Sequence, residues 1–98
     1  MGQLSDFNVP SPSLQRQQRA VDDVLAERRR QDSKWGEQNH LDLTWLAILT
    51  EEVGETAQEI LTNQFGAVGN GHGDLREEVV QVVAVALAWL EAIDRRAS

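Results

Sequence analysis

Glutamates recur at helical spacing in two segments of the sequence. In the first segment, Glu52, Glu55 and Glu59 lie within about 60° of one another on a helical wheel. In the second segment, Glu78 is followed one turn later by Gln81. Carboxylate oxygens are the ligands that Mg²⁺ prefers, and glutamates one turn apart can share one cation or bridge two. Mg²⁺ there would neutralise triphosphate oxygens and lower the pKa of an attacking water, although the same spacing also fits a plain exposed acidic stripe.

Other site chemistries find little support in the sequence. It contains no cysteine, which excludes disulfides, thiolate nucleophiles and zinc–thiolate sites. No serine, histidine and carboxylate set has a recognisable catalytic spacing, and no Walker-type phosphate loop occurs. The formal net charge of −7 argues against a nucleic-acid partner, because such a partner requires a basic surface to neutralise its phosphates.

The length and composition predict one small domain. The 98 residues fit a single domain. No apolar stretch approaches the roughly 18 residues that a membrane span needs. The N-terminal residues lack the basic and apolar pattern of a secretion signal. We therefore expect a cytoplasmic protein with no membrane partner.

A helix is predicted after a short N-terminal segment. Residues 1–10 show no period and are expected to form a flexible tail, which leaves 11–98 as the single domain. Ser11 can cap a helix that starts at Pro12 and runs to about Gln31. A polar connection, 32–40, should follow.

Two more helices are predicted in the rest of the chain. The second is expected to follow a cap at Asn39 or Asp42 and to run to about Asn63. A glycine-rich loop, 64–73, should separate it from a third helix, capped by Asp74 and running to about Asp94. No strand pattern is found, so the predicted class is all-α.

Each predicted helix carries an apolar stripe at i, i+3 and i+4 spacing. We expect the second and third helices to form an antiparallel hairpin through these stripes, with the N-terminal helix packed against it. Pairing two such units into a four-helix-bundle oligomer would bury the remaining apolar surface. The stripes are Leu14, Val21 and Leu25; Leu46, Leu49, Val53, Ala57 and Ile60; and Leu75, Val79, Val83, Ala86, Leu90 and Ile93.

Two further groups of side chains have expected places. Trp45 and Ile48 lie on the same wheel sector as Glu52, and Trp89 lies beside the apolar stripe of the third helix. Packing in the core or at a dimer interface is expected for them, and the alternative for Trp45 is a place in a base pocket. The basic run Arg28-Arg29-Arg30 is interpreted as a solvated helix end that complements the helix dipole, with a phosphate or partner contact as the alternative.

The string Glu51-Glu52-Val53-Gly54-Glu55, followed after a loop by residues 75–81, resembles the MazG-like nucleoside triphosphate pyrophosphohydrolases. The signature of that family is ExxE, a spacer and then ExxD. The resemblance covers about residues 31–94. It implies an all-α dimer or dimer of dimers that uses Mg²⁺, with Mn²⁺ as a substitute. It also implies hydrolysis between the α- and β-phosphates of a nucleoside triphosphate.

The resemblance assigns metal ligands residue by residue. Glu52 and Glu55 match ExxE, and Glu78 matches the glutamate of ExxD. Gln81 stands where the family has aspartate, so this position contributes no charge. Another carboxylate, such as Glu51, Glu59 or Glu77, is expected to compensate, or the site binds one ion more weakly.

The resemblance also assigns roles beside the metal. Glu51 or Glu55 would orient or deprotonate the attacking water. Trp35 could stack on the base or simply anchor the second helix, and His40 could contact base, sugar or phosphate or be a polar residue near a helix start. Lys34 could meet a phosphate, although an exposed lysine is the favoured interpretation. The predicted function is removal of surplus or non-standard nucleoside triphosphates by a homodimer or homotetramer. The alternative is a non-catalytic nucleotide-binding or helical interaction module with a degenerate metal site.

Overall fold

The computed structural model describes residues 10–64 and 75–97, which form three helices. They are α2 (Pro12–Trp35), α3 (Asp42–Gln64) and α4 (Leu75–Ala97). These residues contain no strand, so the all-α prediction is confirmed for them. The expected N-terminal tail up to residue 9, the glycine-rich loop from residue 65 and the cap at Asp74 lie outside the described residues.

The ends of α2 follow from three residues. The Ser11 hydroxyl accepts a hydrogen bond from the Leu14 N–H at 3.1 Å, and Pro12 opens the helix, so the predicted start is confirmed. The predicted end at Gln31 is four residues short. The polar residues after Gln31 do not break a helix, whereas Gly36 does, since it adopts a φ of 74° that other residues avoid.

The expected caps of α3 are not formed. Asp42 is the first residue of the helix, and its carboxylate instead accepts hydrogen bonds from Trp89 Nε1 at 3.0 Å and from Arg96 at 2.9 Å. The Asn39 side chain likewise accepts from Arg95 at 3.0 Å. Tertiary partners on α4 have therefore taken the polar groups that could have capped α3.

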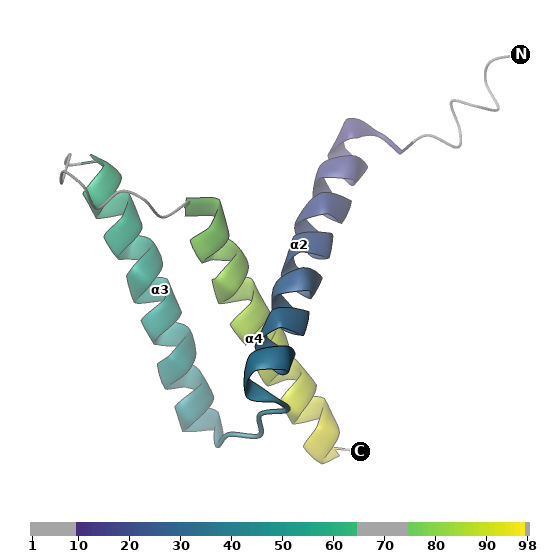
Figure 1. Cartoon of the computed structure of the whole chain (residues 1–98), viewed down its shortest axis with the longest axis vertical. Helices are drawn as coiled ribbons and strands as arrows, with labels where there is room; N and C mark the ends of the chain where they lie inside the picture. Colours follow the sequence, from purple (N-terminus) through teal and green to yellow (C-terminus); the bar gives the residue numbers. More distant parts are fainter. Residues whose placement is uncertain (1–9, 65–74, 98) are drawn as a thin grey trace, which may run out of the picture.

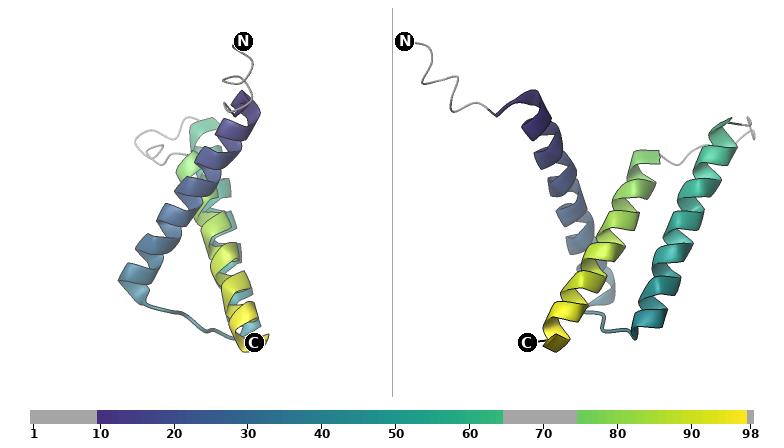
Figure 2. Two further views of the ribbon diagram at one scale, coloured as in Figure 1. Left: turned by 90° about the vertical axis from the view of Figure 1, so that its right-hand side faces the viewer. Right: turned by 180° about the vertical axis from the view of Figure 1, so that it is seen from behind.

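The central element is α4, which contacts both other helices (Figure 1). It forms an antiparallel hairpin with α3, and α2 crosses it on another side, as the turned views show (Figure 2). Among the described residues, α2 and α3 each pack on α4 and not on each other. Residues 12–22 of α2 are all exposed, because the helix diverges from α4 toward its N-terminal end.

The core lies between the first half of α3 and the second half of α4. Trp45 is 2% exposed and packs with Val85, Ala88 and Ala92, which confirms core packing for this tryptophan. The two alanines have side chains small enough to let the large indole ring approach the α4 backbone. Ile48, Leu49 and Trp89 are partly buried around this cluster.

The predicted packing faces are wrong. Most stripe residues are exposed, including Val53 at 50% and Leu90 at 53%. The α3–α4 contact instead uses the sector that holds Trp45 and Glu52, about 100° around the α3 wheel from the stripe. The exposed stripe members are Leu14, Val21, Leu25, Leu46, Val53, Ala57, Ile60, Leu75, Val79, Val83, Leu90 and Ile93.

The described helices also bear on the membrane question. None of the three combines the length and the apolar character that crossing a membrane would require.

Candidate metal centre and adjoining pocket

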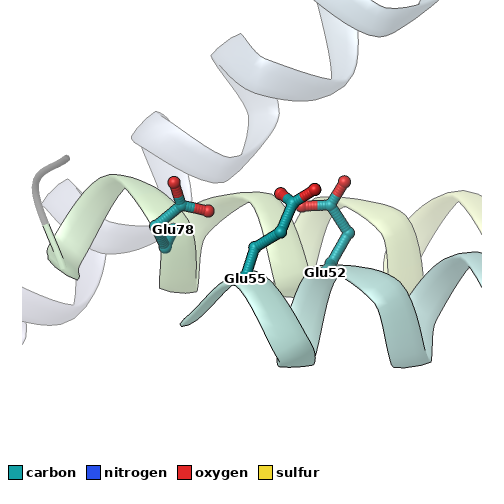
Figure 3. A group of neighbouring side chains, drawn as sticks. All are labelled: Glu52, Glu55 and Glu78. Carbon is teal, nitrogen blue, oxygen red and sulfur yellow. The ribbon is translucent and has the colours of Figure 1, made fainter. Parts of the chain in front are cut away.

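Three carboxylates from two helices meet beside the α3–α4 contact. Glu52 and Glu55 come from α3, Glu78 comes from the first turn of α4, and one oxygen of each lies within 4.8 Å of the others. Figure 3 shows the two α3 side chains pointing to the same side as Glu78. The structure thus brings together the three glutamates that the sequence assigned as metal ligands.

Helical periodicity and the hairpin place these residues. Glu52 and Glu55 are one turn apart, so their side chains leave α3 in nearly the same direction. Because α4 runs antiparallel to α3, its first turn lies beside the second half of α3, where Glu78 faces them. The predicted meeting of two acidic edges therefore occurs, although most residues of the apolar stripes expected to drive it are exposed.

The cluster is electrostatically uncompensated. Burial raises the pKa of Glu52 above its ordinary value, and the charges of Glu55 and Glu78 raise it further. Burial also raises the pKa of Glu78, with added repulsion from Glu55 and Glu59. One oxygen each of Glu52 and Glu78 is buried and accepts no hydrogen bond from the described part of the chain. Both groups therefore lack the donor or cation that a buried carboxylate oxygen needs.

This donor set fits a hard divalent cation. Mg²⁺ takes oxygen ligands at about 2.1 Å, so opposite ligands lie about 4.2 Å apart, close to the spread of this cluster. Two half-buried carboxylates and the exposed Glu55 would leave room for the waters that Mg²⁺ retains. A cation would supply the partner that both orphaned oxygens lack.

The structure also places the remaining candidate ligands, Gln81 and three further glutamates. Gln81 is half-buried one turn after Glu78, and Glu51 and Glu77 are exposed. Glu59 is buried and accepts a hydrogen bond from Asn63 at 3.2 Å. Of the three suggested compensating carboxylates, Glu59 is therefore the one on the inner side of α3.

A pocket of about 690 Å³ adjoins the carboxylate cluster, and Glu52 belongs to the cluster and also lines the pocket. Trp35 and His40 also line it, as the resemblance implied for base-binding residues. The His40 ring meets the Trp45 ring edge-on at 4.9 Å and pairs with the Gln38 side chain at 3.1 Å. Trp45 lines the pocket as well, so this tryptophan serves both the core and the pocket wall.

Lys34 is not among the residues that line this pocket. Its ammonium instead lies 4.7 Å from the centre of the Trp35 ring, on the exposed surface of α2. The structure therefore places Lys34 beside a pocket residue and does not direct it into the pocket.

Sequence reasoning missed Arg28. The expected solvated helix end is wrong for this residue, which is 8% exposed, although Arg29 and Arg30 are exposed. Its guanidinium binds Glu91 of α4 and Asp32 of α2, and it forms a wall of the pocket. These carboxylates hold the pKa of Arg28 above its ordinary value, with Glu91 contributing most. The burial of Arg28 was indicated by its position on the helical wheel, close to Leu14, Val21 and Leu25. Its place in a run of three arginines obscured that signal.

Comparisons with known proteins add no assignment. No protein-family model matches the chain, and no curated protein or solved structure matches it.

Proposed function

We propose that this protein is a Mg²⁺-dependent nucleoside triphosphate pyrophosphohydrolase of the kind that its sequence resembles. The observation that carries the proposal is the convergence of Glu52, Glu55 and Glu78, with two buried oxygens that lack a partner among the described residues. Such a cluster would repel a triphosphate unless cations lay between the two. Mg²⁺, or Mn²⁺ in its place, would neutralise the phosphates and favour ionisation of a water.

The chain's own residues have distinct parts in this proposal. Glu52 and Glu78 are half-buried and would act as fixed ligands, with the amide oxygen of Gln81 as a neutral fourth. Glu55 is exposed, so it can hold a cation and still accept a proton from the attacking water, as can the neighbouring Glu51. Water attacks the α-phosphorus and the bond to the bridging oxygen of the β-phosphate breaks, giving a monophosphate and pyrophosphate. The role would be removal of surplus or non-standard nucleotides in the cytoplasm.

A non-catalytic module is the second candidate. Gln81 favours it, because an amide adds no charge to the cluster. In that case the same carboxylates would bind a metal–nucleotide complex without turnover. Alternatively, the exposed helix surfaces would bind a helical partner.

The exposed stripes lead us to propose a homo-oligomer. On the α3–α4 hairpin, Val53, Val83 and Leu90 are 50%, 44% and 53% exposed. Exposed apolar faces of this kind are typical of interaction surfaces. Pairing through Val53 and Val83 would give a homodimer, and Leu14 and Val21 on α2 would remain for a second pairing into a homotetramer.

Glu55→Gln is the test of the catalytic assignment. It should lower pyrophosphate release by about a thousandfold, which corresponds to about 4 kcal/mol in the barrier. The assay screens common (d)NTPs with Mg²⁺ and then Mn²⁺, and it scores pyrophosphate and orthophosphate separately. Asp94→Asn, an exposed carboxylate outside the cluster, is the matched control and should retain turnover. If the wild type binds nucleotide by calorimetry but releases no product, the non-catalytic candidate replaces this one.

Val83→Glu tests the oligomer. The wild type should sediment as a dimer or tetramer at micromolar concentration, and the variant should lose that assembly, because a charge would be buried in an apolar contact. Gln58→Glu adds the same charge at an exposed polar site of α3 and should assemble normally. A monomeric wild type would refute this part of the proposal.

A further inference from the structure

The pocket beside the carboxylates has a composition unlike that of a phosphate site. Four acidic residues line it against two arginines, an excess of two negative charges. A phosphate would be repelled there, whereas an uncharged group rich in hydrogen-bond donors would be attracted. Because Glu52 belongs to both the pocket and the carboxylate cluster, a nucleotide whose phosphates lie at the cluster can extend its base into the pocket.

Arg28 does not supply donors to a ligand. Its five N–H groups are all used within the chain. Nε and Nη2 donate to Glu91 at 2.9 and 2.7 Å, and Nη1 and Nη2 donate to Asp32 at 3.0 and 3.2 Å. Nη1 also donates to Gln31 at 3.3 Å. This arginine therefore fixes two carboxylates in place on the pocket wall.

These two carboxylates remain able to accept more hydrogen bonds. Each oxygen of Asp32 and Glu91 takes one bond from Arg28 and has a second lone pair. The side chains of Asp32 and Glu91 are 55% and 40% exposed, so a ligand can reach them. The pocket wall thus presents an array of fixed acceptors.

Trp45 supplies an independent sign of a ligand. It lines the pocket, it is 2% exposed, and its indole Nε1–H has no acceptor among the described residues. A buried donor without a partner destabilises the folded state. A ligand that carries one acceptor beside its donors would remove this penalty.

We infer that the pocket selects a nucleobase with an exocyclic amino group next to a ring acceptor, as in cytosine and adenine, over the keto bases uracil and thymine. This inference rests on the proposed function for the presence of a nucleotide. The amino group donates to Asp32 or Glu91, and the ring acceptor receives the Trp45 N–H. In uracil a carbonyl oxygen replaces the amino group, so it meets carboxylate oxygens that cannot donate to it.

Cytidine and uridine provide the test, because their bases differ in this amino-to-keto exchange. Two-dimensional ¹H–¹⁵N NMR follows the indole N–H signals during titration without metal, with the Trp45 signal identified by Trp45→Phe. Cytidine should shift the Trp45 signal and bind about tenfold or more tightly than uridine. Equal binding, tighter uridine binding or no shift with either nucleoside would overturn the inference.

The double variant Asp32→Asn, Glu91→Gln tests the assigned acceptors. Each amide keeps one of the two oxygens that accept from Arg28 and adds N–H donors for a keto oxygen, so the ratio of cytidine to uridine affinity should fall toward one. Asp94→Asn is the matched control, and circular dichroism confirms folding of each variant. A preference unchanged in the double variant would overturn the assignment. Since the nucleosides carry no phosphate and the assay no metal, this outcome is separate from the pyrophosphate assay.

Discussion

The contact between α3 and α4 has two halves of opposite character. Where α3 begins, Trp45 packs against Ala88 and Ala92 in a buried apolar cluster. Two turns further along α3, Glu52 and Glu55 face Glu78 with no compensating cation among the described residues. One pair of helices therefore packs for stability at one end and places like charges together at the other.

The difference indicates how the cluster is maintained. Like charges about one turn apart or across a helix contact oppose folding, and burial adds to that penalty. The Trp45 contact and the hydrogen bonds that Asp42 accepts from Trp89 and Arg96 offset this penalty, because they fix the helices at the opposite end. A repulsive cluster held by packing elsewhere is typical of a functional site.

Removing the packed half should produce the largest change in stability. Trp45→Ala should lower the free energy of unfolding by about 3–5 kcal/mol, since it removes the largest fully buried side chain. Chemical denaturation measures this. Trp35→Ala, which removes a ring that is 60% exposed, is the matched control and should cost less than about 1 kcal/mol. Similar losses for both variants would mean that the Trp45 cluster is not what holds the hairpin.

A divalent cation should turn the acidic half of the contact from destabilising to stabilising. At a hundredfold excess over its dissociation constant, Mg²⁺ should raise the free energy of unfolding by about 2.7 kcal/mol by binding the folded state. Glu52→Gln should abolish most of that gain while raising stability in EDTA, because it removes a partly buried charge beside Glu55 and Glu78. Thermal melts of both proteins with EDTA, Mg²⁺ and Mn²⁺ measure the effect. An equal gain in stability with Mg²⁺ in wild type and variant would show that the cation does not bind at this site.

The sequence predicted the acidic half better than the packed half. Helical spacing predicted two acidic edges that could meet, and the family resemblance assigned Glu52, Glu55 and Glu78 to one site. The helix sectors that join in the hairpin bring these three residues together. The packing was mispredicted because the stripes containing Val53 and Val83 are more apolar than the alanine face that is buried. Periodicity identifies apolar faces, but it does not tell a face buried within the chain from one left exposed.

The long-range polar contacts were beyond pattern reasoning. The burial of Arg28 depends on Glu91, which is 63 residues away, and the diversion of Asp42 from capping depends on Trp89, 47 residues away. Such pairings require the relative placement of two helices, which local propensity does not encode. The pocket therefore could be predicted only in part, through Trp35 and His40.

The pH dependence of stability should show the charge of Glu52 as a smaller effect than the two above. The effect is smaller because Glu52 is partly open to solvent and its charge is screened. Its pKa is raised on folding, so the folded state holds this proton at a pH where the unfolded state has released it. Relative to Glu52→Gln, the wild type should therefore lose stability as the pH rises through 4.5 and above, the ordinary value for this group. The difference between the two proteins isolates this effect from Glu91, whose pKa is lowered and whose contribution has the opposite sign.

Denaturation of both proteins in EDTA across this pH range measures the difference. In Mg²⁺ the sign should invert, because the cation binds the ionised carboxylate and favours the wild type as the pH rises. A wild type that gains stability over Glu52→Gln with rising pH in EDTA would show that Glu52 already has a favourable partner within the chain. In that event the acidic half would be a structural network, and the metal and its chemistry would have to be sought elsewhere.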